Sequence, residues 1–366
     1  MARSRSTASD GPDTADTADG AKPDAIRTRL LIVSDTHAAA GAANTSPIIE
    51  VTLDADIAIH CGDLTQESKL AEFQIAIDLL RSINAPLKLV IAGNHDFTLD
   101  APVFRNKVEE ACRLQGIEQQ LIARDYGEYG EARQLFDKAK DAGIVFLDEG
   151  NYDFRLDNGA LLKVYASPFT PSVGDWGFQY ALQQGHRFAI EDGTHLVITH
   201  GPPLSICDYV RSPGGPPRAG CGSLFAAVAR ARPLLHCFGH IHEDWGARYV
   251  TWRDEPTQNA SHFTDIENRA SAVIETLSTI RDPARKRTAS ECDGCVSTKH
   301  GLEDSLPLHL GRQTLFVNAA VEDSSPSQSP HLPWLVELEL PCYTMVHTST
   351  LDPTPSQKVD SGSMAI

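Results

Sequence analysis

Residues 29–37 read Arg-Leu-Leu-Ile-Val-Ser-Asp-Thr-His, and this stretch decides the fold that the sequence predicts. Leu-Leu-Ile-Val is an apolar run typical of a buried strand. The run leads directly into Asp35 and His37, two metal-ligand side chains separated by one residue. In open α/β sheets, ligands bind in the crevice at the carboxyl ends of the strands. We therefore expect a strand at residues 29–33, followed by a binding site that contains Asp35 and His37.

The same arrangement occurs four more times along the chain. Runs that indicate strands cover residues 56–60, 87–91, 195–199 and 235–238, one of them more mixed in composition than the others. They lead into Gly62-Asp63, Gly93-Asn94-His95-Asp96, His200-Gly201-Pro202-Pro203 and Gly239-His240-Ile241-His242. Each block taken singly is better explained as a turn or a hydrogen-bonded histidine. Together they favour a metal site, because burying so many imidazoles and carboxylates without a cation leaves costly unpaired polar groups.

The ligand types restrict the metal without selecting one. Imidazole, carboxylate and carboxamide donors suit divalent manganese, iron, zinc or cobalt, and thiolates are missing from the five blocks. The predicted ligands are Asp35, His37, Asp63, Asn94, His200, His240 and His242.

Helical patterns separate the predicted strands. Leu70, Phe73, Ile77 and Leu80 recur at helical spacing and predict an amphipathic helix of about four turns. Residues 102–142 are expected to be mostly helical. Further strands are expected at residues 144–147, 161–165, 314–317 and 334–340. The alternation of strands and helices indicates an α/β domain whose later strands form a partly antiparallel second sheet.

The composition divides the chain into one domain and two terminal segments. Residues 1–27 are rich in Asp, Ala and Thr and predict a disordered leader, and residues 349–366 predict a disordered tail. The domain would cover residues 28–348. Within it, residues of about 253–311 are polar and predict an insertion between two strands, with a short helix around residues 272–280.

Charge and cysteine usage exclude some classes of partner. The net charge of −17 opposes binding to polymeric nucleic acid or to an anionic membrane surface. No apolar run approaches the ~20 residues of a membrane helix. The eight cysteines are scattered and mostly lie in apolar strands, and the first residues lack the apolar core of a secretory signal. We therefore expect a cytoplasmic protein that acts on a small molecule.

The five blocks, in this order, resemble the signature of the calcineurin-like metallophosphoesterase superfamily: Asp-x-His, Gly-Asp, Gly-Asn-His-Asp, His and Gly-His-x-His. A narrower resemblance is to the metallophosphoesterase-domain-containing proteins, a group with animal brain members and many fungal relatives. Residues 59–65, 166–168 with 176–178, 199–203 and 239–243 carry it. The resemblance covers nearly the whole ordered chain. It implies a four-layer α/β/β/α sandwich of two mixed β-sheets flanked by helices, with two metals where strand ends meet.

The resemblance also implies how the ligands are shared between two divalent ions, manganese being the first expectation. The first ion would take Asp35, His37, Asp63 and His242. The second would take Asp63, Asn94, His200 and His240, so Asp63 would bridge the pair. Two cations about 3.5–4 Å apart can activate a shared hydroxide and clamp the phosphoryl oxygens.

His95 is implied to be catalytic and not a ligand. It would give a proton to the leaving oxygen or stabilise charge in the transition state, with Asp96 orienting its ring. Such a general acid contributes about 10²–10⁴-fold to the rate.

Departures from other branches narrow the substrate. Serine/threonine phosphatases of this superfamily carry Asp-Arg-Gly shortly after Gly-Asp and Glu after Asn-His, whereas this chain continues with residues 64–67 as Leu-Thr-Gln-Glu and has Asp96. Purple acid phosphatases add a tyrosine ligand soon after Gly-Asp, and this chain has none there. The narrower resemblance therefore implies a phosphodiesterase for small diesters such as cyclic nucleotides or aryl diesters.

Two side chains are candidates for contacting that substrate. Trp176 could stack on a base, and Arg218, in a Gly/Pro-rich loop, could reach a phosphate. The alternatives are core packing for Trp176 and a solvated loop position for Arg218. Other functions stay open: a phosphomonoesterase, or a metal-binding scaffold or regulatory protein with weak phosphoesterase activity. In the second case, residues 253–311 could dock a protein partner that the sequence does not identify.

Overall fold

Strand β1 (Ala25–Val33) has both faces buried at its carboxyl end, as its continuous apolar run requires. Leu30 and Ile32 face one core, and Leu31 and Val33 face another. β1 pairs in parallel with β2 (Ile57–His60) and antiparallel with β16 (Trp334–Pro341). The prediction of a strand at residues 29–33 is confirmed. The boundary of the predicted leader is wrong for residues 25–27, because β16 supplies paired partners back to Ala25.

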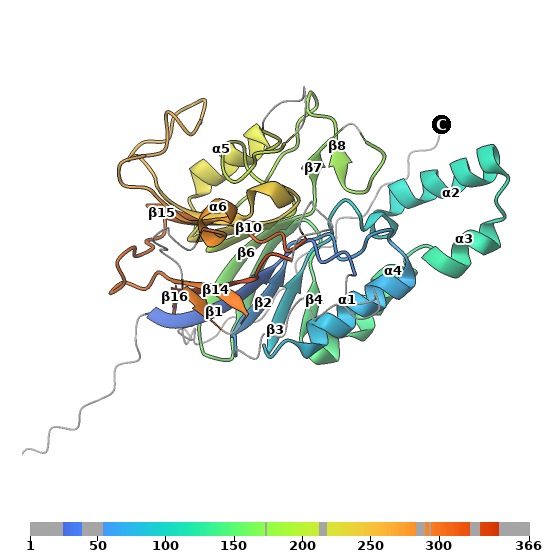
Figure 1. Cartoon of the computed structure of the whole chain (residues 1–366), viewed down its shortest axis with the longest axis horizontal. Coiled ribbons are helices and arrows are strands. Elements are labelled where there is room, and N and C mark those ends of the chain that lie inside the picture. The colour runs from blue at the N-terminus through green and yellow to red at the C-terminus, as the bar shows by residue number, and fades with distance from the viewer. Residues whose placement is uncertain are drawn as a thin grey trace, which may run out of the picture.

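The computed structural model describes residues 25–38, 54–172, 174–211, 218–282, 290–292, 294–322 and 330–343. Two seven-stranded sheets form its centre (Figure 1). The first has the order β13 (Ser290–Cys292), β14 (Cys295–Lys299), β16, β1, β2, β3 (Leu87–Val90), β4 (Ile144–Phe146). The second has the order β12 (Ala272–Thr276), β11 (Gly246–Thr251), β15 (Gln313–Asn318), β10 (Leu235–Phe238), β9 (Leu196–Thr199), β6 (Leu161–Ser167), β5 (Gly150–Arg155).

Both sheets are mixed. β1, β2, β3 and β4 run parallel, as do β6, β9, β10 and β15, while antiparallel partners lie toward the edges. A separate two-stranded ribbon joins β7 (Thr170–Pro171) to β8 (Gln179–Tyr180). The parallel strands direct their carboxyl ends to the same edge, which is where the predicted ligand blocks follow.

The helices lie outside the sheets. They are α1 (Leu70–Ser82), α2 (Ala101–Gln115), α3 (Gln119–Tyr126), α4 (Glu131–Lys138), α5 (Gly222–Ala231) and α6 (Leu277–Ile280), with single 3₁₀ turns η2 (Phe97–Leu99), η3 (Lys140–Ala142) and η4 (His242–Asp244). Among the described residues, none of the helices combines the length and apolar composition needed to cross a membrane.

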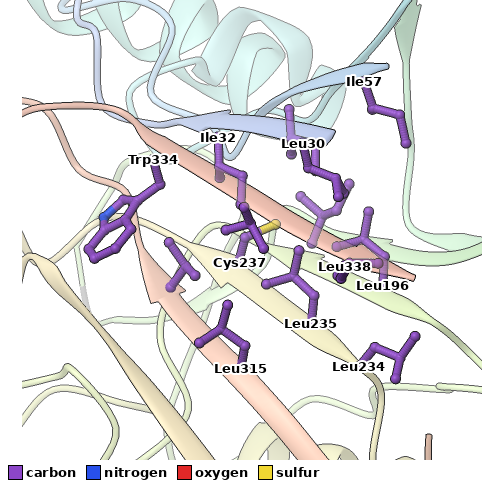
Figure 2. Close-up of a cluster of buried hydrophobic side chains, with 14 of the residues drawn as sticks. Leu30, Ile32, Ile57, Leu196, Leu234, Leu235, Cys237, Leu315, Trp334 and Leu338 are labelled. Atoms are coloured by element: carbon purple, nitrogen blue, oxygen red, sulfur yellow. The ribbon is translucent and has the colours of Figure 1, made fainter. Parts of the chain in front are cut away.

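The largest core lies between the sheets. Figure 2 shows side chains of β1 and β16 pointing toward those of β10 and β15. The labelled members are Leu30, Ile32, Ile57, Leu196, Leu234, Leu235, Cys237, Leu315, Trp334 and Leu338. Alternate residues of each strand supply this core and an outer one, so the sheets stack face to face.

Helices cover the two outer faces. Phe73 and Ile77 of α1 and Phe136 of α4 pack on the first sheet, and Phe225 and Val228 of α5 pack on the second. Figure 1 shows α2 and α3 extending away from the sheets. The order helix, sheet, sheet, helix confirms the predicted four-layer α/β/β/α sandwich.

The polar segment of residues 253–311 does lie between two strands, β11 and β15, but it is not a simple insertion. Its β12 pairs with β11, and its β14 pairs with β16 and with β13, so the segment supplies the edge strands β12 and β13 of the two sheets. The helix predicted around residues 272–280 is wrong for residues 272–276, because pairing with β11 overrides the weak helical pattern. Only Leu277–Ile280 is helical. The predicted leader up to residue 24 and the predicted tail from residue 349 lie outside the described residues.

One carboxylate holds the first loop of this segment. Asp265 is fully buried and accepts the backbone N–H of Thr257 at 2.8 Å and of Ser261 at 2.9 Å. It also accepts the hydroxyls of Thr257 at 2.7 Å and Thr264 at 2.6 Å. Burial raises the pKa of Asp265, but these hydrogen bonds outweigh burial and lower it to about 2.

We predict that Asp265→Ala lowers the free energy of unfolding by about 1–3 kcal/mol, because buried donors lose their acceptor. Urea denaturation measures this. A carboxylate with a lowered pKa stabilises the fold above its unfolded pKa and stops doing so as the pH falls through its folded pKa. The difference from wild type should therefore shrink as the pH falls from about 5 toward 2. The exposed control Glu255→Ala should change the unfolding free energy by under about 0.5 kcal/mol. Equal effects of the two variants would contradict the assignment.

Candidate metal centre

The ligand blocks meet where the carboxyl ends of the parallel strands of one sheet lie beside those of the other sheet. After β1, the N–H of Asp35 donates to the carbonyl of Gly62, which follows β2, at 3.0 Å. In the second sheet, the N–H of Gly239 donates to the carbonyl of His200 at 2.9 Å. The two sheets are joined at this edge, because the N–H of His240 donates to the Asp35 carboxylate at 3.0 and 3.1 Å.

The backbone of the ligand blocks is strained. Asp35, His37, Asp63 and His240 have φ angles of 56°, 46°, 53° and 68°, in the left-handed region that non-glycine residues rarely adopt. Each costs of order 1–3 kcal/mol, and such residues persist only where the surroundings fix them. Their concentration in the predicted ligands is typical of a functional site.

Two glycines allow the blocks to approach one another. A Cβ on Gly93 would overlap the Asp63 carboxylate and lie 2.7 Å from Cε1 of His200. A Cβ on Gly239 would overlap the Asp35 carboxylate and the Ser34 hydroxyl. Each position therefore needs a residue without a side chain.

The first ligand group contains Asp35, His37 and His242, whose donor atoms lie within 4.8 Å of one another. Nε2 of His242 is 3.2 Å from Oδ1 of Asp35. His37 holds its Nδ1 against the carbonyl of Thr65 at 3.1 Å, which directs its Nε2 into the group. A backbone carbonyl in this role fixes the ring orientation and tautomer of a ligating histidine.

The second group contains Asp63, His200 and His240, also within 4.8 Å. Nδ1 of His200 contacts the carbonyl of Cys61 at 2.9 Å, and its Nε2 lies 3.3 Å from Oδ2 of Asp63. The amide oxygen of Asn94 is 2.9 Å from the same Nε2. All four ligands predicted for the second ion therefore lie together.

Asp63 lies between the two groups. Its Oδ2 is 3.3 Å from Nε2 of His200 in the second group and 3.9 Å from Nε2 of His37 in the first. Its Oδ1 accepts the backbone N–H of His95 at 2.8 Å. This placement is the one that a bridging carboxylate needs.

Electrostatics keep both aspartates ionised despite their burial. Burial raises the pKa of Asp35, but the hydrogen bond and charge of His242 outweigh it and hold the pKa far below the usual range. For Asp63 the opposing charge comes mainly from His200, with the same outcome. Ionised carboxylates are the form that binds a metal.

The imidazoles divide into two classes. Burial lowers the pKa of His200 and of His242, but the neighbouring Asp63 and Asp35 outweigh burial and raise each pKa to about 9. Burial, together with the charge of His200, lowers the pKa of His240 to about 4. The lowered pKa values of the two aspartates and the raised pKa values of His200 and His242 thus favour opposite charges on neighbouring groups.

The chemistry of the donors fits divalent cations. Nε2 of His37 is buried and makes no directed hydrogen bond within the described residues. The two ligand groups together offer two carboxylates, a carboxamide oxygen and three further imidazoles. Cations such as manganese, iron, zinc or cobalt would satisfy these donors together, whereas protons satisfy them only in part.

His95 lies beside the cluster as predicted, but Asp96 does not orient it. The ring Nδ1 of His95 contacts the carbonyl of Gln66 at 2.7 Å. Asp96 is fully buried and accepts three backbone N–H groups, of Gly93 at 2.8 Å, Thr65 at 3.0 Å and Leu64 at 3.1 Å. The predicted orienting role of Asp96 is therefore wrong, because its oxygens are occupied in joining the two ligand loops. His37, Asp63 and His95 also have donor atoms within 4.8 Å of one another, which places His95 beside the first ligand group.

Trp176 lies directly on His95. The ring centroids are 4.2 Å apart and the planes are inclined by 32°. The loop that carries Trp176 is fixed to the ligand segment, since the N–H of Gly177 donates to the carbonyl of Asn94 at 3.0 Å and that of Phe178 to Asp100 at 2.7 Å. Trp176 keeps 37% of its surface exposed, so it is neither a core residue nor fully exposed to solvent.

The structure does not bring Arg218 to the ligands. Its guanidinium pairs with Asp208, which is fully buried and also accepts the N–H of Ser205 at 2.8 Å. In the described part of the chain, no contact joins Arg218 to any of the seven predicted ligands. Its pairing indicates a structural role for a residue that we predicted to bind substrate.

Sequence reasoning missed Glu322. This residue follows β15 after three buried apolar residues, the same signal that identified the other blocks. Its Oε2 lies 3.1 Å from Nε2 of His37 and 3.7 Å from Nδ1 of His242.

A cavity of about 310 Å³ between α2 and α3 is a separate feature, since its lining, which includes Phe97 and Lys107, contains none of the predicted ligands.

Comparison with known proteins bears on the same region. The family model for calcineurin-like phosphoesterases matches residues 28–244, which include all seven predicted ligands. A probable rhamnogalacturonate lyase C of Emericella nidulans is 33% identical over 228 residues, which are 61% of this chain and 18% of that protein. The metallophosphoesterase domain-containing protein 1 of Homo sapiens is 31% identical over 225 residues, which are 60% of this chain and 62% of that protein.

The matches therefore span less than two thirds of these relatives. Among solved structures, a purple acid phosphatase from yellow lupin (Lupinus luteus) seeds is 13% identical with a TM-score of 0.35, covering 84% of this chain and 47% of that one.

We predict that Gly93→Ala lowers the free energy of unfolding by about 1–3 kcal/mol and weakens manganese binding by about 10–100-fold. The added Cβ displaces Asp63 and His200, which belong to one ligand group. Thermal unfolding and manganese titration measure the two effects. Gly222→Ala is the matched control, because its Cβ would meet only Leu204 at 3.8 Å. Normal manganese affinity in Gly93→Ala would contradict the close approach.

We also predict that cation binding to metal-free protein releases protons. An imidazole must lose its proton to bind a metal, and His200 and His242 have pKa values of about 9. About two protons should leave at pH 7, and the apparent affinity should rise with pH until about 9. Titration in weak buffer with a pH indicator measures the release. Affinity that does not change with pH would show that these histidines are not ligands.

Proposed function

The chain belongs to the calcineurin-like phosphoesterase family, and on this premise we propose that it is a metal-dependent hydrolase of small phosphodiesters. Two divalent cations would be held by the seven predicted ligands. The observation that carries the proposal is the position of Asp63, whose Oδ2 lies 3.3 Å from His200 and 3.9 Å from His37. A carboxylate shared by two imidazole groups is what a pair of adjacent cations requires.

The ligands would divide as the site geometry groups them. Asp35, His37 and His242 would hold the first cation and Asn94, His200 and His240 the second, with Asp63 shared. When bound, such cations supply Lewis acidity toward phosphoryl oxygens and make water nucleophilic at neutral pH.

His95 supports hydrolysis of a diester. The alkoxide that leaves a phosphodiester needs a proton, and His95 is the imidazole beside the cluster that belongs to neither the first nor the second ligand group. Its Nδ1 is held by the carbonyl of Gln66, so Nε2 is the atom that can deliver the proton. Its backbone N–H donates to Asp63, which fixes the distance between the acid and the ligands.

Trp176 supports the same role for His95. Its stacking on the imidazole limits rotation of the ring about its side-chain bonds, and its exposed remainder is available to an aromatic part of a substrate. We therefore propose aryl diesters and cyclic nucleotides as the substrate class, with Trp176 in contact with the leaving group.

Manganese is the cation that we propose, on the family resemblance, because the imidazole, carboxylate and carboxamide donors suit manganese, iron, zinc and cobalt alike. A reducing compartment such as the cytoplasm agrees with the cysteines. Cys61, Cys112, Cys207, Cys221, Cys237 and Cys342 form no disulfide in the structure.

We predict that the protein with added manganese hydrolyses bis-p-nitrophenyl phosphate and that two variants lose activity in different ways. Asp63→Ala should abolish both turnover and binding of the cation pair, because it removes the shared carboxylate. His95→Ala should bind manganese normally and lower kcat by about 10²–10⁴-fold. Release of nitrophenolate and metal content per chain measure the two quantities.

Each variant serves as the control for the other, because Asp63 and His95 are neighbours and the backbone N–H of His95 donates to Asp63. Full activity in Asp63→Ala would show that the ligand assignment is wrong. Loss of metal in His95→Ala would show that His95 is a ligand of the first ion and not the acid.

A further inference from the structure

Glu322 is placed beside the first ligand strand by the backbone. After β15, the carbonyl of Ala319 accepts the N–H of Ser34 at 3.0 Å, and the N–H of Val321 donates to the carbonyl of Ser34 at 3.0 Å. Ala320 forms a parallel bridge with Ser34. The segment thus joins the end of the second sheet to the end of β1, and Asp35 follows immediately. Val321 is buried, while the side chain of Glu322 is 45% exposed.

The Glu322 carboxylate reaches two ligands of the first cation. Its Oε2 lies 3.1 Å from Nε2 of His37 and 3.7 Å from Nδ1 of His242. Asp35 lies on another side of His242, with its Oδ1 3.2 Å from Nε2. Glu322 therefore adds a third carboxylate to the centre, on the side of the first group that is open to solvent.

The contact between Glu322 and His37 is favourable only with a proton or a metal ion between the two atoms. Nδ1 of His37 faces the carbonyl of Thr65 and so carries a ring proton, which leaves Nε2 as the nitrogen that can bind a metal ion. An ionised carboxylate has only acceptor oxygens. Two lone-pair atoms 3.1 Å apart repel unless a proton or a metal ion lies between them. No directed hydrogen bond satisfies Nε2 among the described residues, and a metal ion would satisfy both atoms.

We propose that Glu322 is a further ligand of the first cation, in addition to the seven residues that the sequence motifs identify. This inference rests on the proposed function only in taking the centre to be a cation site. Its consequence is unequal metal affinity. The first cation would have three carboxylates around it, from Asp35, Asp63 and Glu322, whereas the second has Asp63 alone.

The test is a manganese titration of metal-free protein by calorimetry, without substrate. Glu322→Gln removes the charge and keeps the size of the side chain. We expect one of the two manganese ions to bind about 10–100-fold more weakly than in wild type, while the other keeps its affinity. Thermal unfolding in excess chelator should be unchanged, because the side chain is 45% exposed.

Glu303→Gln is the matched control, because Glu303 is exposed and has no described contact with the ligands. Wild-type affinity for both ions in Glu322→Gln would overturn the proposal. Equal weakening in Glu303→Gln would also overturn it, because that result would indicate a general effect of net charge. Weaker binding in Glu322→Gln together with a lower unfolding temperature would overturn it as well. This test measures manganese binding and not hydrolysis. A protein without diesterase activity would therefore still show whether Glu322 binds the cation, and a negative result for Glu322 would not contradict the proposed diesterase activity.

Discussion

Two ionised carboxylates buried among imidazoles impose the constraint on which this structure depends. Asp35 is fully buried and Asp63 is 2% exposed, so each would be strongly destabilised without opposite charge nearby. The protonated His242 and His200 supply that charge. That charge satisfies the donors only in part. Divalent cations in place of the protons would satisfy the remaining donors as well.

The sandwich fold brings these groups to one place. Continuous apolar strands stack two sheets face to face, and their shared core fixes the strands relative to one another. The ligand blocks then leave the sheets through backbone in the left-handed region, with glycines where blocks touch. The hydrophobic core thereby offsets the strain, which short loops alone could not sustain.

Hydrogen bonds to backbone groups position the loops and the imidazole rings around the ligands. Asp96 joins the loops after β2 and β3 through three N–H groups, and carbonyls hold the rings of His37, His95 and His200. Trp176 adds an aromatic cover to His95 from a loop that is itself bonded to the ligand segment. Rigid backbone, not neighbouring charge, thus determines where the proposed acid can deliver its proton.

The sequence by itself determined the strands that precede the ligand blocks and which side chains are predicted as ligands, because an apolar run followed by a donor residue is a local pattern. Residues 272–276 show the limit, since a weak helical pattern became a strand only through pairing with β11. The partners of Asp96, the pairing of Arg218 with Asp208 and the stacking of Trp176 were also decided by tertiary structure. Glu322 lies nearly 300 positions from His37 and contacts it only because two sheets meet. The apolar run before Glu322 is a local pattern, but its contact with His37 depends on which strands pack together, and that is decided by the tertiary structure.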